Sequence, residues 1–234
     1  AAHRGIRRWP FFDQDLNRRF PGRSGAHAPD QVAAKLVEDL TGVHQLVEVR
    51  GAHPAFTEAL QAQVRGGDQE AAELARHTNV EVVWARSPGP AAPSTLVYQF
   101  PRSIVLEGGT GNRLTAGIAE ALANGVLNLL NVLKVLPDDA LPFHWAGVAR
   151  PTVVKDAEVE RLRAEVGGLF LPVVRPWGPV EAGDLVGEVV DPIGGRLLEE
   201  VRSPFAGRVL ALREQPVVLP GTMVARVVAG GDHV

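Results

Sequence analysis

The feature that most constrains the fold is a repeat in the last third of the chain. The segments VEAGDLVGEV (180–189) and VLPGTMVARV (218–227) share the pattern V-x-x-G-x-x-V-x-x-V, and each follows a glycine, Gly168 or Gly207, that opens an alternating strand. Two copies of strand, turn, glycine and strand predict two interlocked β-hairpin units related by a pseudo-dyad, with glycines supplying the turn conformations. The alternative is a chance recurrence in a segment rich in Val and Gly.

The chain before this repeat alternates between two kinds of pattern. Helical periodicity covers 28–40, 54–64, 69–77 and 115–137, and strand patterns cover 43–50, 79–85 and 103–111. This alternation predicts an α/β layer with mostly parallel strands, and Thr115 is the expected N-cap of the last helix. Helical periodicity fades between about residues 137 and 150. We therefore divide the chain into domains 1–145 and 146–234.

Composition narrows the class of protein. With 234 residues, of which 45% are hydrophobic, the chain can bury a real core. A net charge of -3 without a basic stripe argues against nucleic acid and anionic membranes as partners. The longest apolar stretch, 117–136, contains Glu120 and Lys134 and is too polar for a membrane span. The absence of cysteine fits a cytoplasmic protein, which is the location we expect, and no signal peptide pattern stands at the start of this sequence.

The segment DQDLNRRFPG (13–22) carries the first candidate site. Arg18 offers a planar fork of donors for a substrate carboxylate, and the amide of Asn17 adds a neutral donor beside it. Asp15, two residues before the amide, is placed to orient Arg18 from behind. The alternative is a surface loop rich in Asp and Asn that caps a helix.

The segment IVLEGGTGNR (104–113) carries the second candidate. An apolar strand ends on Glu107, followed by glycines that would let a substrate approach the backbone. A partly desolvated carboxyl group there is suited to act as general base and then as general acid. The alternative is a glycine-rich turn in which Glu107 pairs with Arg113.

Other catalytic patterns are absent from the sequence. It contains no G-x-S-x-G elbow and no H-x-x-E or H-E-x-x-H pair, and no G-K-[ST] follows the glycines. Cysteine is absent, so a metal site would need His, Asp and Glu. His44 and Glu48 lie about 13 Å apart on an extended strand, too far to chelate one ion, so we expect His44 to be structural or to face a loop.

Taken together, these segments resemble the succinylglutamate desuccinylase/aspartoacylase family of zinc-dependent deacylases, which are related to the zinc carboxypeptidases. The resemblance rests on DLNRRFPG (15–22), on SIVLEGGTGNRL (103–114) and its following helix GVLNLLNVLKVL (125–136), and on the C-terminal strands. It implies a carboxypeptidase-like mixed sheet flanked by helices. A small all-β domain of the barrel-sandwich, lipoyl-like type would follow.

The resemblance also implies roles for single residues. Asn17 and Arg18 would hold the substrate carboxylate, and Asp15 would orient Arg18. Arg7 or Arg8 would polarise the scissile carbonyl. Glu107 would activate a water bound to zinc, one ion per chain, and then protonate the leaving amine.

The sequence departs from the family at the zinc ligands. The family's H-G-x-E motif upstream of DLNR has no counterpart, and the segment nearest to its D-x-H motif is EDLTG (38–42), without the histidine. No metal ligand is identifiable. The chain starts on Ala rather than Met, so we expect a longer natural protein, with its beginning and an internal piece absent from this sequence.

Three functional hypotheses follow. The first is a zinc-dependent deacylase that cleaves an amide of an N-acyl amino acid or similar small carboxylate. The second is a non-catalytic relative, without zinc, that binds a carboxylate ligand or a partner. The third, a lipoyl or biotinyl carrier, is excluded because the hairpin DPIGGRLLEE (191–200) has no lysine. The β domain would instead cap the catalytic domain or support a homo-oligomer.

Overall fold

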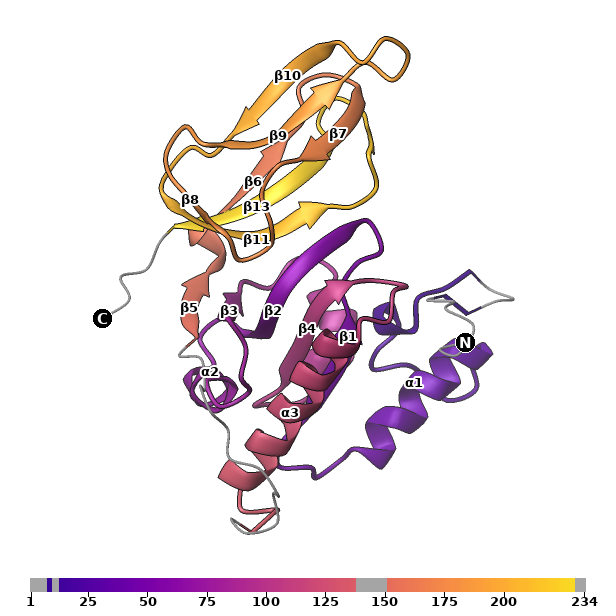
Figure 1. Ribbon diagram of the computed structural model, residues 1–234. Coiled ribbons are helices and arrows are strands. Elements are labelled where there is room, and N and C mark those ends of the chain that lie inside the picture. Colours follow the sequence, from indigo (N-terminus) through magenta and orange to yellow (C-terminus); the bar gives the residue numbers. More distant parts are fainter. Residues whose placement is uncertain (1–7, 10–12, 138–150, 230–234) are drawn as a thin grey trace.

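The computed structural model describes residues 8–9, 13–137 and 151–229 (Figure 1). The helices are α1 (Ala28–Asp39), α2 (Gln69–Ala75) and α3 (Ala116–Val132), with short 3-10 helices at Leu16–Arg18, Ala92–Ser94, Leu96–Tyr98 and Asp156–Glu158. The strands before the repeat are β1 (Val47–Gly51), β2 (Phe56–Arg65), β3 (Val82–Arg86), β4 (Ile104–Thr110), β5 (Thr152–Lys155) and β6 (Val159–Arg163). The repeat contributes β7 (Gly168–Pro172), β8 (Pro179–Val180), β9 (Leu185–Val190), β10 (Leu197–Arg202), β11 (Gly207–Arg213), β12 (Val217–Val218) and β13 (Met223–Ala229).

Three of the four predicted helices are confirmed. The helices expected over 28–40 and 69–77 are α1 and α2, and the one expected over 115–137 is α3, which ends earlier, at Val132. Thr115 occupies the N-cap position of α3, but its side chain makes no capping hydrogen bond. The helix predicted over 54–64 is wrong, because that segment forms most of β2.

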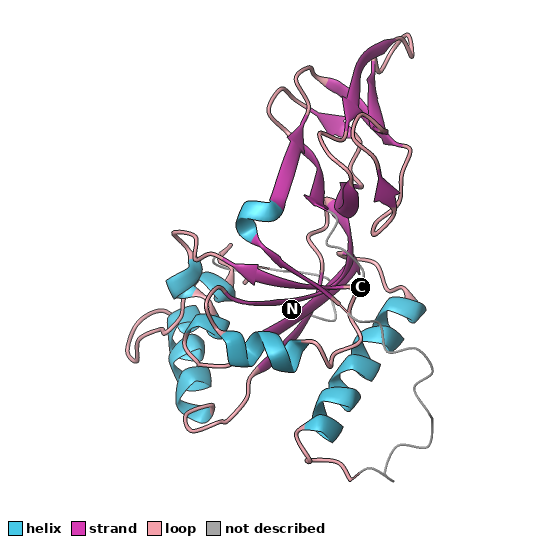
Figure 2. Ribbon diagram, turned by 90° about the vertical axis from the view of Figure 1, so that its left-hand side faces the viewer, coloured by secondary structure: helices cyan, strands magenta, loops and turns pink. Residues whose placement is uncertain are grey.

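Within the described residues, one mixed sheet of nine strands runs through the molecule (Figures 1 and 2). Its main path is β1-β4-β2-β11-β13-β6, with β3 and β5 continuing from the second half of β2. The pairs β1–β4, β2–β3 and β3–β5 are parallel, whereas β2–β4 is antiparallel. The sheet is therefore mixed, as the resemblance implied.

The repeat forms the predicted pair of interlocked units. Strand β8 of the first copy pairs with β11 of the second, and β12 of the second pairs with β7 of the first. The two repeat glycines, Gly183 and Gly221, have φ of +88° and +83°, the turn conformation that side chains rarely adopt. Gly168 and Gly207 serve another purpose: a Cβ on them would lie 2.6 Å from the carbonyl oxygen of Val190 and 2.0 Å from that of Val228.

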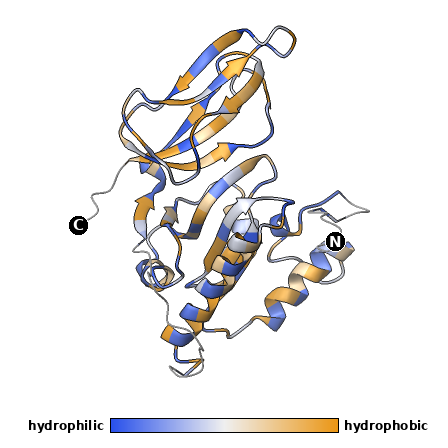
Figure 3. Cartoon of the chain, in the orientation of Figure 1, coloured by the Kyte–Doolittle hydropathy of each residue, from blue (hydrophilic) through white to orange (hydrophobic). Residues whose placement is uncertain are grey.

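The two faces of the sheet in the first part of the chain differ in polarity because side chains alternate along each strand. One face is apolar and packs against α2 and α3, with Ala62, Val64, Val83, Ile104 and Leu106 in its core. The opposite face carries the polar residues of the same strands. The alternation of apolar and polar residues along the strands is visible in Figure 3.

The predicted division between domains at 145/146 falls within residues 138–150, which lie outside the described part. After that segment, β5 pairs with β3 before the chain enters the β domain, and β11 pairs with the first residues of β2. Among the described residues, no helix is long and apolar enough to cross a membrane.

Candidate active site

Glu107 lies at the centre of the polar face of the sheet. Its strand, β4, is flanked by β1 and β2, and Glu107 stands opposite Arg50 of β1 in the parallel register. Only 6% of Glu107 is exposed. A carboxylate with so little access to water needs hydrogen-bond donors beside it.

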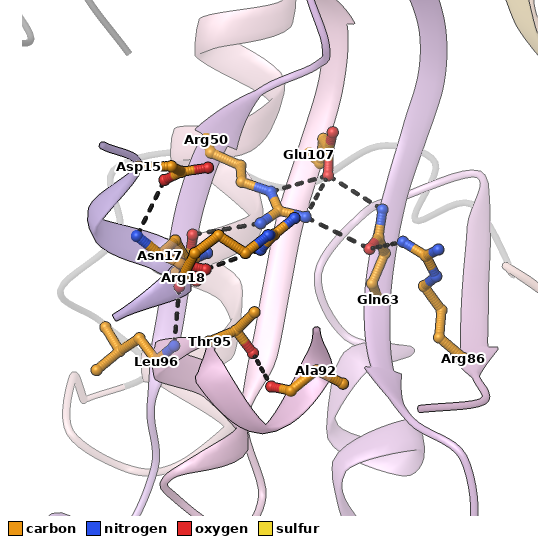
Figure 4. Close-up of polar contacts among 11 residues, drawn as sticks. Asp15, Asn17, Arg18, Arg50, Gln63, Arg86, Ala92, Thr95, Leu96 and Glu107 are labelled. Carbon is orange, nitrogen blue, oxygen red and sulfur yellow. Dashed lines mark hydrogen bonds and ion pairs between the residues drawn. The ribbon is translucent and has the colours of Figure 1, made fainter. Parts of the chain in front are cut away.

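Three nitrogen atoms meet one oxygen of that carboxylate. Glu107 Oε2 accepts hydrogen bonds from Nε of Arg50 at 2.9 Å and from Nε2 of Gln63 at 3.0 Å, and it forms an ion pair with Nη2 of Arg50 at 2.9 Å (Figure 4). Arg50 also reaches Glu48, with Nη1 at 3.4 Å from Oε1. Among the described residues, every side-chain hydrogen bond and ion pair of Glu107 falls on Oε2, which leaves Oε1 as the oxygen to meet water or a ligand.

The row of polar residues continues across the sheet. Gln63 Oε1 accepts from Nη1 of Arg86 on β3 at 3.1 Å, and lies 3.5 Å from Nη2 of Arg50. The indole ring of Trp84 lies beneath the Arg86 guanidinium, 4.5 Å from its centre. Four adjacent strands, β1, β4, β2 and β3, thus place a guanidinium, a carboxylate, an amide and a second guanidinium side by side.

The charges in this row shift the ionisation of its members. Burial works against the charged form of Arg50, but the carboxylates of Glu107 and Glu48 outweigh it, so the pKa of Arg50 is raised and the group stays positive. Burial lowers the pKa of Arg86; the carboxylate of Asp156 works against this shift, and the charge of Arg226 adds to it. Burial, followed by the charge of Glu107, raises the pKa of Glu58, which pairs with Arg226 of β13 at 3.2 Å.

The segment DLNRRFPG closes one side of the site. Asp15 caps the 3-10 helix by accepting from the backbone N–H of Asn17 at 3.0 Å. The Asn17 side-chain oxygen accepts from the backbone N–H of Leu96 at 2.8 Å, and Arg18 Nη1 donates to the Asn17 carbonyl at 2.7 Å (Figure 4). The segment is therefore tied both to itself and to the 3-10 helix Leu96–Tyr98, which precedes β4.

The end of the same motif packs on α1. Phe20 is 5% exposed and joins Pro21 through a cis peptide bond. Gly22 has φ +79°, and a Cβ there would lie 2.3 Å from the carbonyl oxygen of Asp30. Only glycine fits this position, which explains the glycine that ends the motif.

The predicted site residues in the described part lie around one cavity of about 980 Å³. Asp15, Asn17, Arg18 and Glu107 all line it. Arg8 also lines it, although its exposed side chain pairs with Asp13 at 2.8 Å. Arg7 lies outside the described residues. The role of Asp15 in orienting Arg18 stays a prediction, since the contact shown is to the backbone of Asn17.

Sequence reasoning missed several residues that line the cavity. They share a place on the polar face of the sheet or on β13, and they are Glu48, Arg50, Glu58, Gln63, Arg86 and Arg226. The signal for Arg50 was the alternation in VEVRG, where Glu48 and Arg50 fall on one face. For Gln63 the same alternation exists along β2, but it gives no signal when residues 54–64 are predicted to form a helix.

The described residues do not fit a zinc site. Nowhere in 8–9, 13–137 and 151–229 do three or more His, Cys, Asp or Glu side chains form a group that could hold a metal ion. EDLTG, the segment closest to the family's third-ligand motif, lies at the end of α1 and in the turn after it. The strand that follows α1 is β1, and its polar positions carry Glu48 and Arg50.

Comparison with known proteins gives a match in structure only. No family model matches the chain, and no curated protein matches it in sequence. A succinylglutamate desuccinylase/aspartoacylase from Rhodobacter sphaeroides superposes with a TM-score of 0.82 at 20% identity, over 99% of this chain and 72% of that one. The product-bound ectoine utilization protein EutE (DoeB) from Ruegeria pomeroyi gives 0.78 at 19% identity, over 97% and 71%.

A third similar structure points the same way. An aspartoacylase family protein from Mesorhizobium loti superposes with a TM-score of 0.71 at 22% identity, covering 96% of this chain and 69% of that one. These matches cover both the sheet with Glu107 and the β domain. The chain therefore has the fold of succinylglutamate desuccinylase/aspartoacylase proteins, which confirms the fold that the motifs implied.

Proposed function

We propose that the protein is a deacylase-type hydrolase that cleaves the amide bond of an N-acyl amino acid or a similar small carboxylate. The observation that carries this proposal is the placement of a buried carboxylate, Glu107, on a cavity that Asn17 and Arg18 also line. The shared fold supports it, because similar structures are named as desuccinylases and aspartoacylases.

In this reaction Glu107 is the group that moves the proton. Water attacks the acyl carbon while Glu107 takes a proton from it, and the carbon–nitrogen bond breaks as that proton passes to the leaving nitrogen. The products are a carboxylic acid and an amine. Oε1 of Glu107 is the oxygen suited to this role, since the contacts of Arg50 and Gln63 fall on Oε2.

Arg18 and the Asn17 segment would position the substrate. A guanidinium binds a carboxylate through paired donors, which fixes both its place and its orientation. The zinc ion implied by the resemblance, one per chain, has no ligand group among the described residues, so Glu107, Arg18 and Asn17 are assigned their roles without it. A cytoplasmic location and a homo-oligomer stay predictions.

A second candidate function is favoured by one contact. The ion pair between Arg50 and Glu107 at 2.9 Å neutralises the carboxylate that hydrolysis needs. A cavity with its acid held in this way suits a non-catalytic relative that binds a carboxylate ligand or a partner.

Measuring amine release distinguishes the two. The full-length protein is incubated with a panel of N-acetyl and N-succinyl amino acids, and the free amine is quantified. We expect release by the wild type and a loss of at least about a hundredfold for Glu107→Gln, the usual scale of a missing general base. Glu120→Gln, on the exposed surface of α3, is the matched control. Saturable binding without release of amine would support the second candidate instead.

A further inference from the structure

The guanidinium of Arg50 lies between two carboxylates that belong to adjacent strands. It contacts Glu107 of β4 at 2.9 Å through Nε and Nη2, and Glu48 of β1 at 3.4 Å through Nη1. Two carboxylates that converge from neighbouring strands form an arrangement that often attracts a divalent cation. In this cavity a side-chain cation takes that position.

The backbone fixes this arrangement. Arg50 and Glu107 stand opposite each other in the parallel β1–β4 register, and Glu48 lies two residues from Arg50 on the same face. Gln63 holds the other side, with its amide N–H on Glu107 and its carbonyl oxygen toward both Arg50 and Arg86. The strand pairing and these contacts thus hold the Arg50 guanidinium beside Glu107. The Arg50 side chain is 34% exposed and lines the cavity.

The charges on the sheet side of the cavity already sum to a positive value. Among the described residues that line the cavity, the sheet strands supply four guanidinium groups and three carboxylates: Arg50, Arg65, Arg86, Arg226, Glu48, Glu58 and Glu107. An added divalent ion would meet the permanent charge of Arg50 at close range, because the two carboxylates beside it, Glu48 and Glu107, are both paired with that guanidinium. The disagreement between this site and the zinc implied by the resemblance therefore has a physical cause.

We propose that Arg50 is the resident cation of this cavity, which occupies the position of a divalent ion between Glu48 and Glu107 and makes the site independent of metal. A carbonyl or carboxylate oxygen of the ligand then faces guanidinium N–H donors instead of a Lewis acid. The inference deepens the proposed function, since it names the positive group that works beside Glu107.

The test measures zinc uptake directly and needs no turnover. The full-length protein is stripped with a chelator and dialysed to equilibrium against Zn²⁺ alone. Three proteins are compared: the wild type, Arg50→Gln, which removes the charge, and Arg50→Lys, which keeps it. Circular dichroism checks that each variant is folded.

We expect the wild type and Arg50→Lys to take up far less than one zinc per chain. Arg50→Gln should bind zinc at least about tenfold more tightly than either, because two facing carboxylates lose their cation. Adding Glu107→Gln to Arg50→Gln should abolish the gain, which places the new ion at this pair. Amine release by the wild type should not change in EDTA.

Two results would overturn the inference. One is submicromolar binding of one zinc per chain by the wild type, which would mean that other residues hold an ion beside Arg50. The other is equal zinc binding by Arg50→Gln and Arg50→Lys, which would mean that the charge of Arg50 excludes nothing. If no amine is released under any condition, the proposed function fails, while the dialysis still decides the role of Arg50.

Discussion

Replacing Arg226 by Met tests how the C-terminal part of the chain stabilises a buried acid of the cavity. Arg226 lies on β13, and its Nη1 is 3.2 Å from Oε1 of Glu58 on β2. The Glu58 side chain is only 4% exposed. At that distance Coulomb's law gives an attraction of about 5 kcal/mol at an effective dielectric constant of about 20.

The expected cost is smaller than this attraction. Glu58 keeps a second partner, since Gln61 Nε2 donates to its Oε2 at 2.5 Å, and Glu58 can also take up a proton. Removal of one partner from a buried pair costs about 3–5 kcal/mol, so we expect about 3 kcal/mol at pH 8.

The cost should depend on pH. Burial and the charge of Glu107 raise the pKa of Glu58, so the folded state holds this proton more tightly than the unfolded state. Stability from such a group is present below the unfolded pKa and is lost as the pH rises through the folded pKa. Without Arg226 the folded pKa rises further. At pH 5, which is less than one unit above the ordinary pKa of a glutamate side chain, Glu58 can take up a proton. This limits the loss of stability caused by Arg226→Met to about 1 kcal/mol.

Urea unfolding at pH 5, 6.5 and 8 measures this difference. The double variant Arg226→Met with Glu58→Gln is the control, because position 58 then carries no ionisable group. Its loss of stability relative to Glu58→Gln should not vary with pH. A loss for Arg226→Met that is the same at pH 5 and pH 8 would refute the reasoning, since the effect would then be one of packing and not of charge.

The other predictions concern two glycines of α3 and the hydrogen bond between Asn17 and Leu96. Gly125→Ala in α3 should destabilise the fold by about 2 kcal/mol or more, because the new Cβ would lie 2.2 Å from the carbonyl oxygen of Thr78. Gly117→Ala in the same helix has open space and should instead stabilise it by about 0.5–1 kcal/mol; urea unfolding compares the two. Asn17→Ala removes the acceptor of the Leu96 N–H, so we expect a loss of about 1 kcal/mol in unfolding and weaker binding of N-acyl amino acids by calorimetry, whereas unchanged binding would separate Asn17 from the site.

The local sequence pattern predicts an element correctly where its tertiary contacts favour the same secondary structure as its residues do. The helix α3 has an apolar stripe, and strand β4 is a run of apolar residues before glycines, so both were predicted from sequence. The repeat was predictable because each copy needs a glycine with positive φ at the same place, Gly183 and Gly221.

The segment that became β2 shows where this reasoning fails. FTEALQAQVR is rich in Ala, Leu, Gln and Glu, which favour helices, yet it pairs with β4, β3 and β11 and is buried along most of its length. Contacts with three other strands outweigh a propensity of a few tenths of a kcal/mol per residue. The error also concealed Gln63, which alternation along a strand would have placed on the polar face.

In the candidate site, the sequence predicted only residues that lie within a single motif. Glu107 and Asn17 each lie in a distinctive segment, and both line the same cavity. The partner of Glu107 was not visible, because Arg50 lies 57 positions away and becomes its neighbour only through the parallel pairing of β1 with β4.

That pairing also decides what kind of chemistry the site can support. A strand whose alternation places Glu48 and Arg50 on the cavity side brings its own positive charge to Glu107. A guanidinium is a weaker polarising group than a metal ion, yet it is never lost to dilution or chelation and carries donors in fixed directions. Any activity of this cavity must therefore work with Glu107 already paired, and a ligand must compete with that pair for Arg50 or use the oxygen of Glu107 that the pair leaves open.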